Sequence, residues 1–190
     1  MHKVMFVLSI ALAVGGCAGF GLIATSNPLE KLMEAEQLLL ANRPMPAERM
    51  IREAMTIYAE RGDRHGLGAA HASYGDFLSS DAVEKWAADY RRSGFQDKSV
   101  SYANRLEKAS EHHRQAIEHY RVAEPQHIES GKFDHLSNLY LNMGKLHVAI
   151  KQNELACSYF DKSFEAYREN IRRNPSVKPW VVDAHPELTQ

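Results

Sequence analysis

Histidine is the residue type that first suggests chemistry, because the chain contains ten of them. Three lie close together, at His112, His113 and His119. In a helix, His112 and His119 share one face but lie about 10 Å apart along the axis. Zinc–nitrogen bonds measure about 2 Å, so these two side chains alone cannot hold one ion. We therefore expect solvated histidines or histidines at the edge of a core, and predict no metal and no cofactor. Four more could join them only through folding: His65, His71, His127 and His135.

Catalytic motifs are not found along the chain. The sequence has no Gly-rich phosphate loop, no nucleophile elbow and no CxxC pair. Two carboxylates can serve as general acid and base, but here the acidic residues are spread along polar helical faces, as chance alone would place them. The sequence therefore predicts a protein that is not an enzyme.

The N-terminal segment has the pattern of an export signal. A basic start, Met1-His2-Lys3, precedes an apolar run from Val4 to Ala13, and small residues then lead to Cys17. A charged start, about 7–15 apolar residues and a small-residue cleavage site are typical of secretory signal peptides.

The small residues directly before Cys17 also resemble the lipobox of bacterial lipoproteins. The resemblance implies that residues 1–16 are a lipoprotein signal peptide, that Cys17 is lipidated, and that residues 17–27 form a tether. Ala18 follows the cysteine in place of Asp, which in such lipoproteins points to the outer membrane, with the protein facing the periplasm.

Two alternatives for this segment remain open. The stretch from Val4 to Ala24 carries no charge and is long enough for a single-pass N-terminal anchor that is not cleaved. The four glycines within 15–21 weaken such a helix. Cleaved export without lipidation is the third possibility.

Composition limits the partners of the mature protein. Removing residues 1–16 leaves about 174 residues, enough for one domain with a core. Their 22 basic and 24 acidic residues nearly balance, which argues against nucleic acid because that ligand requires a basic surface. The only other cysteine is Cys157, so an exported, lipidated chain has no internal disulfide available.

The remaining residues predict an all-α fold. Helix-forming residues dominate, and no segment alternates between apolar and polar side chains. Capping residues, glycines and prolines place the expected helices at about 28–40, 46–60, 64–79, 82–93, 100–124, 133–150 and 154–174.

A repeat of 34 residues links these helices. Residues 28–61 and 137–170 fit the tetratricopeptide (TPR) pattern, and a third copy is interrupted by about 22 inserted residues. The positions that carry the fit are Ala35, Ala47, Ile51, Ala54, Tyr74, Gly75, Ala109, Ala116, Tyr140, Met143, Gly144, Ala156 and Phe160. The chain resembles TPR proteins, which implies antiparallel helix pairs in a short right-handed superhelix over residues 28–175. The insertion covers about 80–100, and residues 176–190 form a tail. A generic helical bundle is the alternative.

The TPR resemblance also implies a binding surface. Such proteins hold a peptide or a partner helix on a concave face built from the first helix of each repeat. By position, the partner-binding residues are Leu32, Glu36, Asp76, Asn138, Leu141 and Lys145. This mixed apolar and acidic face would suit an apolar or basic segment. The insertion adds Trp86, Tyr90 and Arg91, residue types that are enriched at interfaces.

Together these features predict an adaptor rather than a catalyst. We expect a TPR-like lipoprotein that is tethered to the outer membrane and binds a protein partner in a periplasmic assembly such as a pilus, a secretion machine or an outer-membrane complex. The alternative is an immunity or inhibitor lipoprotein that caps a toxic enzyme in the periplasm.

Overall fold

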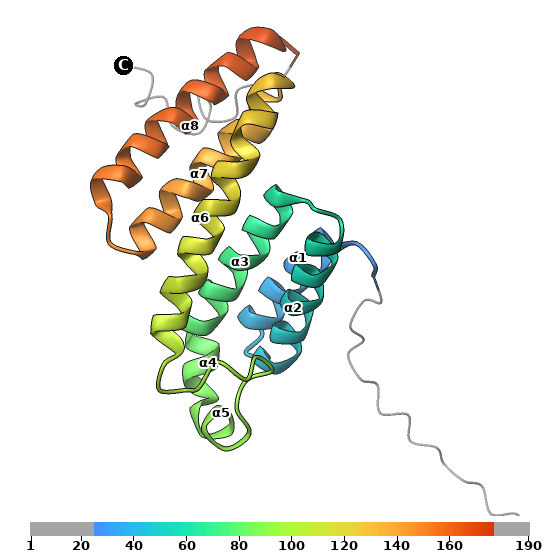
Figure 1. Cartoon of the computed structure of the whole chain (residues 1–190), viewed down its shortest axis with the longest axis vertical. Helices are drawn as coiled ribbons and strands as arrows, with labels where there is room; N and C mark the ends of the chain where they lie inside the picture. Colours follow the sequence, from blue (N-terminus) through green and yellow to red (C-terminus); the bar gives the residue numbers. More distant parts are fainter. Residues whose placement is uncertain (1–24, 177–190) are drawn as a thin grey trace, which may run out of the picture.

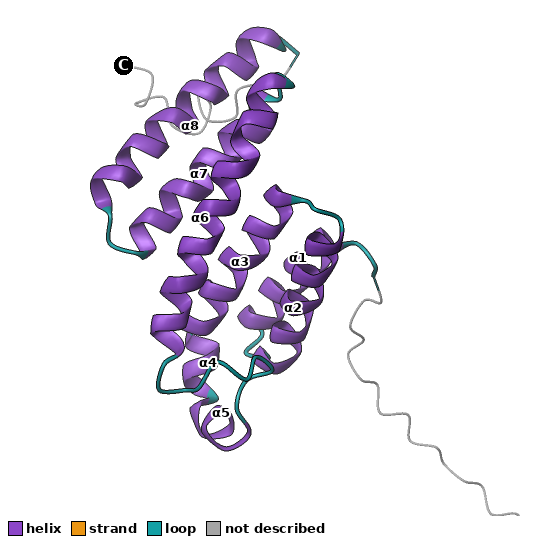
Figure 2. Ribbon diagram, viewed as in Figure 1, coloured by secondary structure: helices purple, strands orange, loops and turns teal. Residues whose placement is uncertain are grey.

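The computed structural model describes residues 25–176 of the chain. These residues form eight helices and no strand (Figure 2). In chain order they are α1 (Pro28–Leu40), α2 (Pro44–Glu60), α3 (Arg64–Ser79), α4 (Asp81–Lys85), α5 (Ala87–Ser93), α6 (Arg105–Glu129), α7 (Phe133–Ala149) and α8 (Asn153–Arg173). The all-α prediction is confirmed. The predicted signal peptide, Cys17 and the tail from residue 177 lie outside the described residues.

The helices pack in pairs. α1 packs on α2, α3 on α6 and α7 on α8, while α2–α3 and α6–α7 contacts join one pair to the next (Figure 1). Within each pair the two helices run in opposite directions. The right-handed superhelical twist remains a prediction.

Four turns between helices have the same conformation. In each, the second residue after the helix has a positive φ: 57° at Asn42, 65° at Gly62, 63° at Gly131 and 62° at Lys151. The next residue then donates its N–H to the carbonyl five positions back, as Arg43 does to Leu38 at 2.8 Å and Gln152 to His147 at 2.8 Å. This is the Schellman arrangement, which satisfies carbonyls that a helix end leaves unpaired. The same local geometry thus reverses the chain four times.

Helix starts follow local capping chemistry. The side chain of Asn27 accepts from Leu29 N at 3.0 Å, and that of Asp63 accepts from Gly66 N at 2.9 Å. Both predicted caps are confirmed. α4 is capped by Ser80, not by the expected Asp81. α2 begins at Pro44 rather than Pro46, since the first helical turn needs no N–H from either proline.

The boundaries predicted for α6 were wrong at both ends. Its first residue is Arg105 rather than Val100, because Val100 packs into the core from the preceding loop. Its last is Glu129, so Pro125 lies inside the helix. An interior proline costs roughly 3 kcal/mol. Here Ala123 is buried against α7 and Glu124 accepts from Tyr140 Oη at 2.6 Å, contacts that offset this cost.

Two clusters of buried side chains make up the core. One joins α1, α2 and α3 to the insertion, and the other joins α6, α7 and α8; Ala69 of α3 packs against both. Close helix approach depends on glycine within the pairs. A Cβ on Gly75 would lie 2.3 Å from the His113 ring, and one on Gly144 would lie 2.4 Å from the Phe160 ring. His113 thus occupies in the α3–α6 pair the place that Phe160 occupies in the α7–α8 pair.

We expect Gly75→Ala to lower the melting temperature measured by circular dichroism. The added methyl would also lie 3.0 Å from the carbonyl oxygen of Ala109. Overpacking costs about 1–3 kcal/mol, more than the gain of up to ~1 kcal/mol from replacing a helical glycine. In a His113→Ala background the same substitution should cost less. An equal cost in both backgrounds would contradict the proposed contact.

Candidate functional site

A groove runs across the first helix of each pair. A hollow of about 420 Å³ lies between α1 and α3, and a second of about 260 Å³ lies between α3 and α7. Both are lined by Ser73 and Asp76 of α3, so the two hollows adjoin each other at this helix. A third hollow of about 320 Å³ adjoins the first through Met33 and Glu36 of α1.

The structure brings four of the six residues predicted for the concave face into this groove. Leu32, Glu36 and Asp76 line the larger hollow, and Asp76 and Lys145 line the smaller one. Asn138 and Leu141 are exposed on α7 but line neither hollow. In their place α7 contributes Asn142 and Ala149, which lie on the side of the helix that faces α3.

Exposed apolar side chains of α1 border the groove. Leu29 is 55% exposed and Met33 is 60% exposed, and both line the larger hollow. The sequence alone did not assign them to the site. The signal was available in the sequence. A helix with apolar residues on more than one face has apolar surface beyond the face that packs on the core, which indicates a second binding face.

A buried histidine lies beneath the acidic centre of the groove. His113 is 5% exposed, and its Nε2 lies 3.0 Å from Oδ1 of Asp76. Because a carboxylate can only accept, His113 donates this bond. It fixes one oxygen of Asp76, while the side chain as a whole remains 72% exposed.

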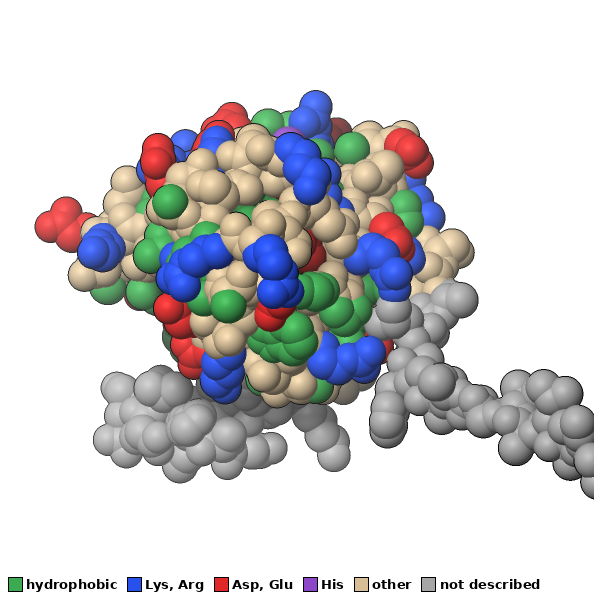
Figure 3. Space-filling model, turned by 90° about the horizontal axis from the view of Figure 1, so that it is seen from below, with side chains coloured by type: hydrophobic (Ala, Val, Ile, Leu, Met, Phe, Trp, Pro, Cys, Tyr) green, Lys and Arg blue, Asp and Glu red, His purple; other side chains and the backbone are tan. Residues whose placement is uncertain are grey.

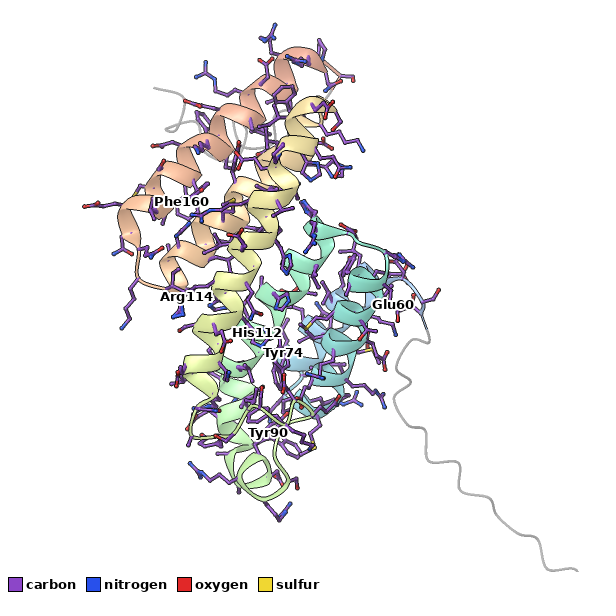
Figure 4. All side chains as sticks on the ribbon, viewed as in Figure 1. Glu60, Tyr74, Tyr90, His112, Arg114 and Phe160 are labelled. Atoms are coloured by element: carbon purple, nitrogen blue, oxygen red, sulfur yellow. The ribbon has the colours of Figure 1, made fainter. Side chains whose placement is uncertain are left out.

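Six other histidines gather along the seam between α3 and the later helices. His71 Nδ1 lies 2.9 Å from His112 Nδ1, and His119 stacks on His71 with ring centroids 5.2 Å apart. Near the start of α3, His65 Nδ1 lies 2.9 Å from His127 Nε2. His135 stacks on His127 at 5.5 Å. In Figure 4, His112 lies on α6 beside Tyr74 of α3, which its ring meets edge-on at 4.7 Å.

Each close histidine pair requires a neutral ring, since one nitrogen must accept the proton that the other donates. Burial, followed by the charges of His112 and His119, lowers the pKa of His71 to about 4. Burial also lowers the pKa of His65, and the charge of His127 acts in the same direction. Within residues 25–176, no three His, Cys, Asp or Glu side chains are arranged to hold a metal ion.

The insertion folds against the first two pairs. Glu48 is 2% exposed and accepts from Tyr74 Oη at 3.1 Å and from Gln96 N at 2.7 Å. Burial raises the pKa of this carboxyl. Arg52 pairs with Asp97 at 3.3 Å. Sequence analysis did not find this network, because its members are far apart in the chain.

The three insertion residues predicted to touch a partner have different surroundings. Tyr90 is 2% exposed and stacks on Phe95 with centroids 4.3 Å apart, so it belongs to the core and does not fit a surface role. Trp86 is half-buried, and its Nε1 donates to Asn42 O at 3.1 Å. Arg91 is exposed and lies over the Tyr102 ring at 4.2 Å. On this end of the molecule, basic side chains are interspersed with acidic and apolar ones (Figure 3).

No family model, curated protein sequence or solved structure matches the chain. None of the helices in residues 25–176 combines the length and apolar character that crossing a bilayer requires.

We expect the protein to lose stability as the pH falls from about 6.5 to about 4. The unfolded chain protonates His71 near its ordinary pKa of 6.5, whereas the folded chain resists protonation until about pH 4. Below pH 6.5 the unfolded state thus binds more protons, and the free energy of unfolding decreases. His71→Gln should flatten this dependence, so that its melting temperature falls by on the order of 5 °C less than that of the wild type between pH 7 and pH 5.

The partner histidine provides the control for this experiment. His71→Gln/His112→Gln should be flatter than either single variant, because burial also lowers the pKa of His112, which therefore contributes its own loss of stability at low pH. Parallel melting curves for wild type and His71→Gln across this pH range would contradict the assignment.

Proposed function

We propose that this protein is a lipid-tethered, periplasm-facing helical adaptor of the bacterial outer membrane. It holds a segment of a protein partner in an envelope assembly such as a pilus, a secretion machine or an outer-membrane complex. The observation that supports this most directly is the row of adjoining hollows across α1, α3 and α7, which is lined in part by exposed apolar side chains.

The composition of the groove suits a protein segment. Leu29 and Met33 expose apolar surface at its edge, and covering such surface contributes about 25 cal/mol per Å². Asp76 and Lys145 supply charged groups that fix orientation rather than affinity. A groove built on three packed helices is preorganised, which reduces the entropy lost on binding.

The proposed anchor adds to this affinity. Acylation at Cys17 would confine the protein to a membrane surface, and two or more acyl chains hold a protein there stably, whereas one alone is marginal. Confinement raises the effective concentration toward partners on the same surface. Modest affinity in the groove is then sufficient for assembly.

Cys17→Ala tests the anchor. We expect this variant to lose incorporation of a fatty-acid analogue and to move from the membrane fraction to the soluble fraction of lysed cells. Cys157→Ala is the matched control, since Cys157 is an exposed cysteine of α8. This substitution should leave labelling unchanged. Retention of Cys17→Ala in the membrane fraction would instead favour an uncleaved anchor.

Photocrosslinking in intact cells tests the groove. A photoreactive phenylalanine at Met33 should form covalent adducts with a partner protein, because Met33 lines two of the three hollows. The same residue at Val122 is the control, since Val122 is 53% exposed on α6 and lines none of these hollows. Equal adducts at the two positions, or none at Met33, would overturn the proposed function.

A further inference from the structure

We propose that the groove selects a partner segment that carries a lysine or arginine between apolar side chains, with the basic group bound between Glu36 and Asp76. The inference rests on the proposed function and specifies its ligand. Both carboxylates line the 420 Å³ hollow, together with Leu29, Leu32 and Met33. None of the residues that line this hollow is basic.

The two carboxylates are not neutralised within the described part of the chain. Glu36 makes no ion pair there, and Asp76 has only its contact with His113. That contact uses Oδ1 of Asp76, so Oδ2 receives no hydrogen bond from a side chain or backbone of residues 25–176. The only basic residue of α1 is Lys31, which is 8% exposed and bonded to Glu53 at 2.6 Å.

The charge of the groove changes along its length. At the α1 end, Glu30 and Glu34 join Glu36 around the adjoining hollow. At the α7 end the charged residue is Lys145, and no ion pair within residues 25–176 joins it to Asp76. A cationic side chain is therefore favoured near α1, and a nucleic acid or an anionic membrane surface is disfavoured there.

Apolar contact and charge act together at this position. The aliphatic stem of a lysine or arginine can lie against Leu29 and Met33 while its charged end reaches the carboxylates. A segment of the same apolar pattern without a basic residue would leave two carboxylates partly desolvated and unpaired. That cost gives the groove its selectivity.

The test uses phage-displayed random peptides of twelve residues, selected against the purified full-length protein in detergent. We expect the selected peptides to share a lysine or arginine within a few positions of two apolar residues. Fluorescence anisotropy then measures the affinity of one such peptide for each variant. Asp76→Asn and Glu36→Gln should each weaken binding about tenfold, which corresponds to about 1.4 kcal/mol, and Asp76→Glu should retain most of the affinity.

Glu60→Gln is the matched control, because Glu60 is an exposed carboxylate at the end of α2, away from the groove (Figure 4). It should not change the affinity, and unchanged melting temperatures would exclude misfolding of the variants.

Selected peptides without a basic residue, or equal affinity for Asp76→Asn and the wild type, would overturn this inference. If selected peptides without a basic residue bind Met33→Ala more weakly than the wild type, the groove still binds protein segments, and only the inference about charge is overturned. If no peptide binds, or if Met33→Ala and the wild type bind with equal affinity, the proposed function is contradicted as well.

Discussion

The close approach of paired helices at a glycine is the contact on which the rest of this structure depends. α3 lies against α6 because Gly75 leaves room for the His113 ring, and α7 lies against α8 because Gly144 leaves room for Phe160. The same His113 donates to Asp76 in the groove. One ring therefore sets the spacing of a helix pair and orients a carboxylate that a partner would meet, so packing and recognition cannot vary independently at this position.

Local chemistry explains why much of the fold could be predicted from the sequence. Asn27 and Asp63 cap helices, and Gly62 and Gly131 end them, through interactions within a few residues. Pro125 was misjudged because the same local rules ignore tertiary gains. α6 continues through it and thereby brings His127 to His65, 62 positions earlier in the chain. A boundary set by such distant contacts is not encoded in any short window of sequence.

The candidate site was predictable to the extent that a helical face is. Repeat register placed Leu32, Glu36, Asp76 and Lys145 on first helices, and all four line the groove. Register does not fix where along each helix the groove crosses, which is why α7 presents Asn142 rather than Asn138, which lies one turn earlier on the same face. Residue type likewise does not show whether a side chain points into the core or toward solvent. The aromatic ring of Tyr90 suits an interface as well as a core, and only packing against Phe95 decides between them.

The insertion lengthens the connection between α3 and α6, yet it also stabilises the packing of the first helix pair against α3. Its loop is bonded to Glu48 and Arg52 of α2, and Trp86 donates to Asn42 in the turn between α1 and α2. These contacts offset the entropic cost of a longer loop, which grows only slowly with length. None of the residues that line the hollows comes from the insertion. By holding the first pair against α3, it keeps Glu36 and Asp76 on facing walls of one hollow, so the spacing of the two acids is set from outside the groove that they line.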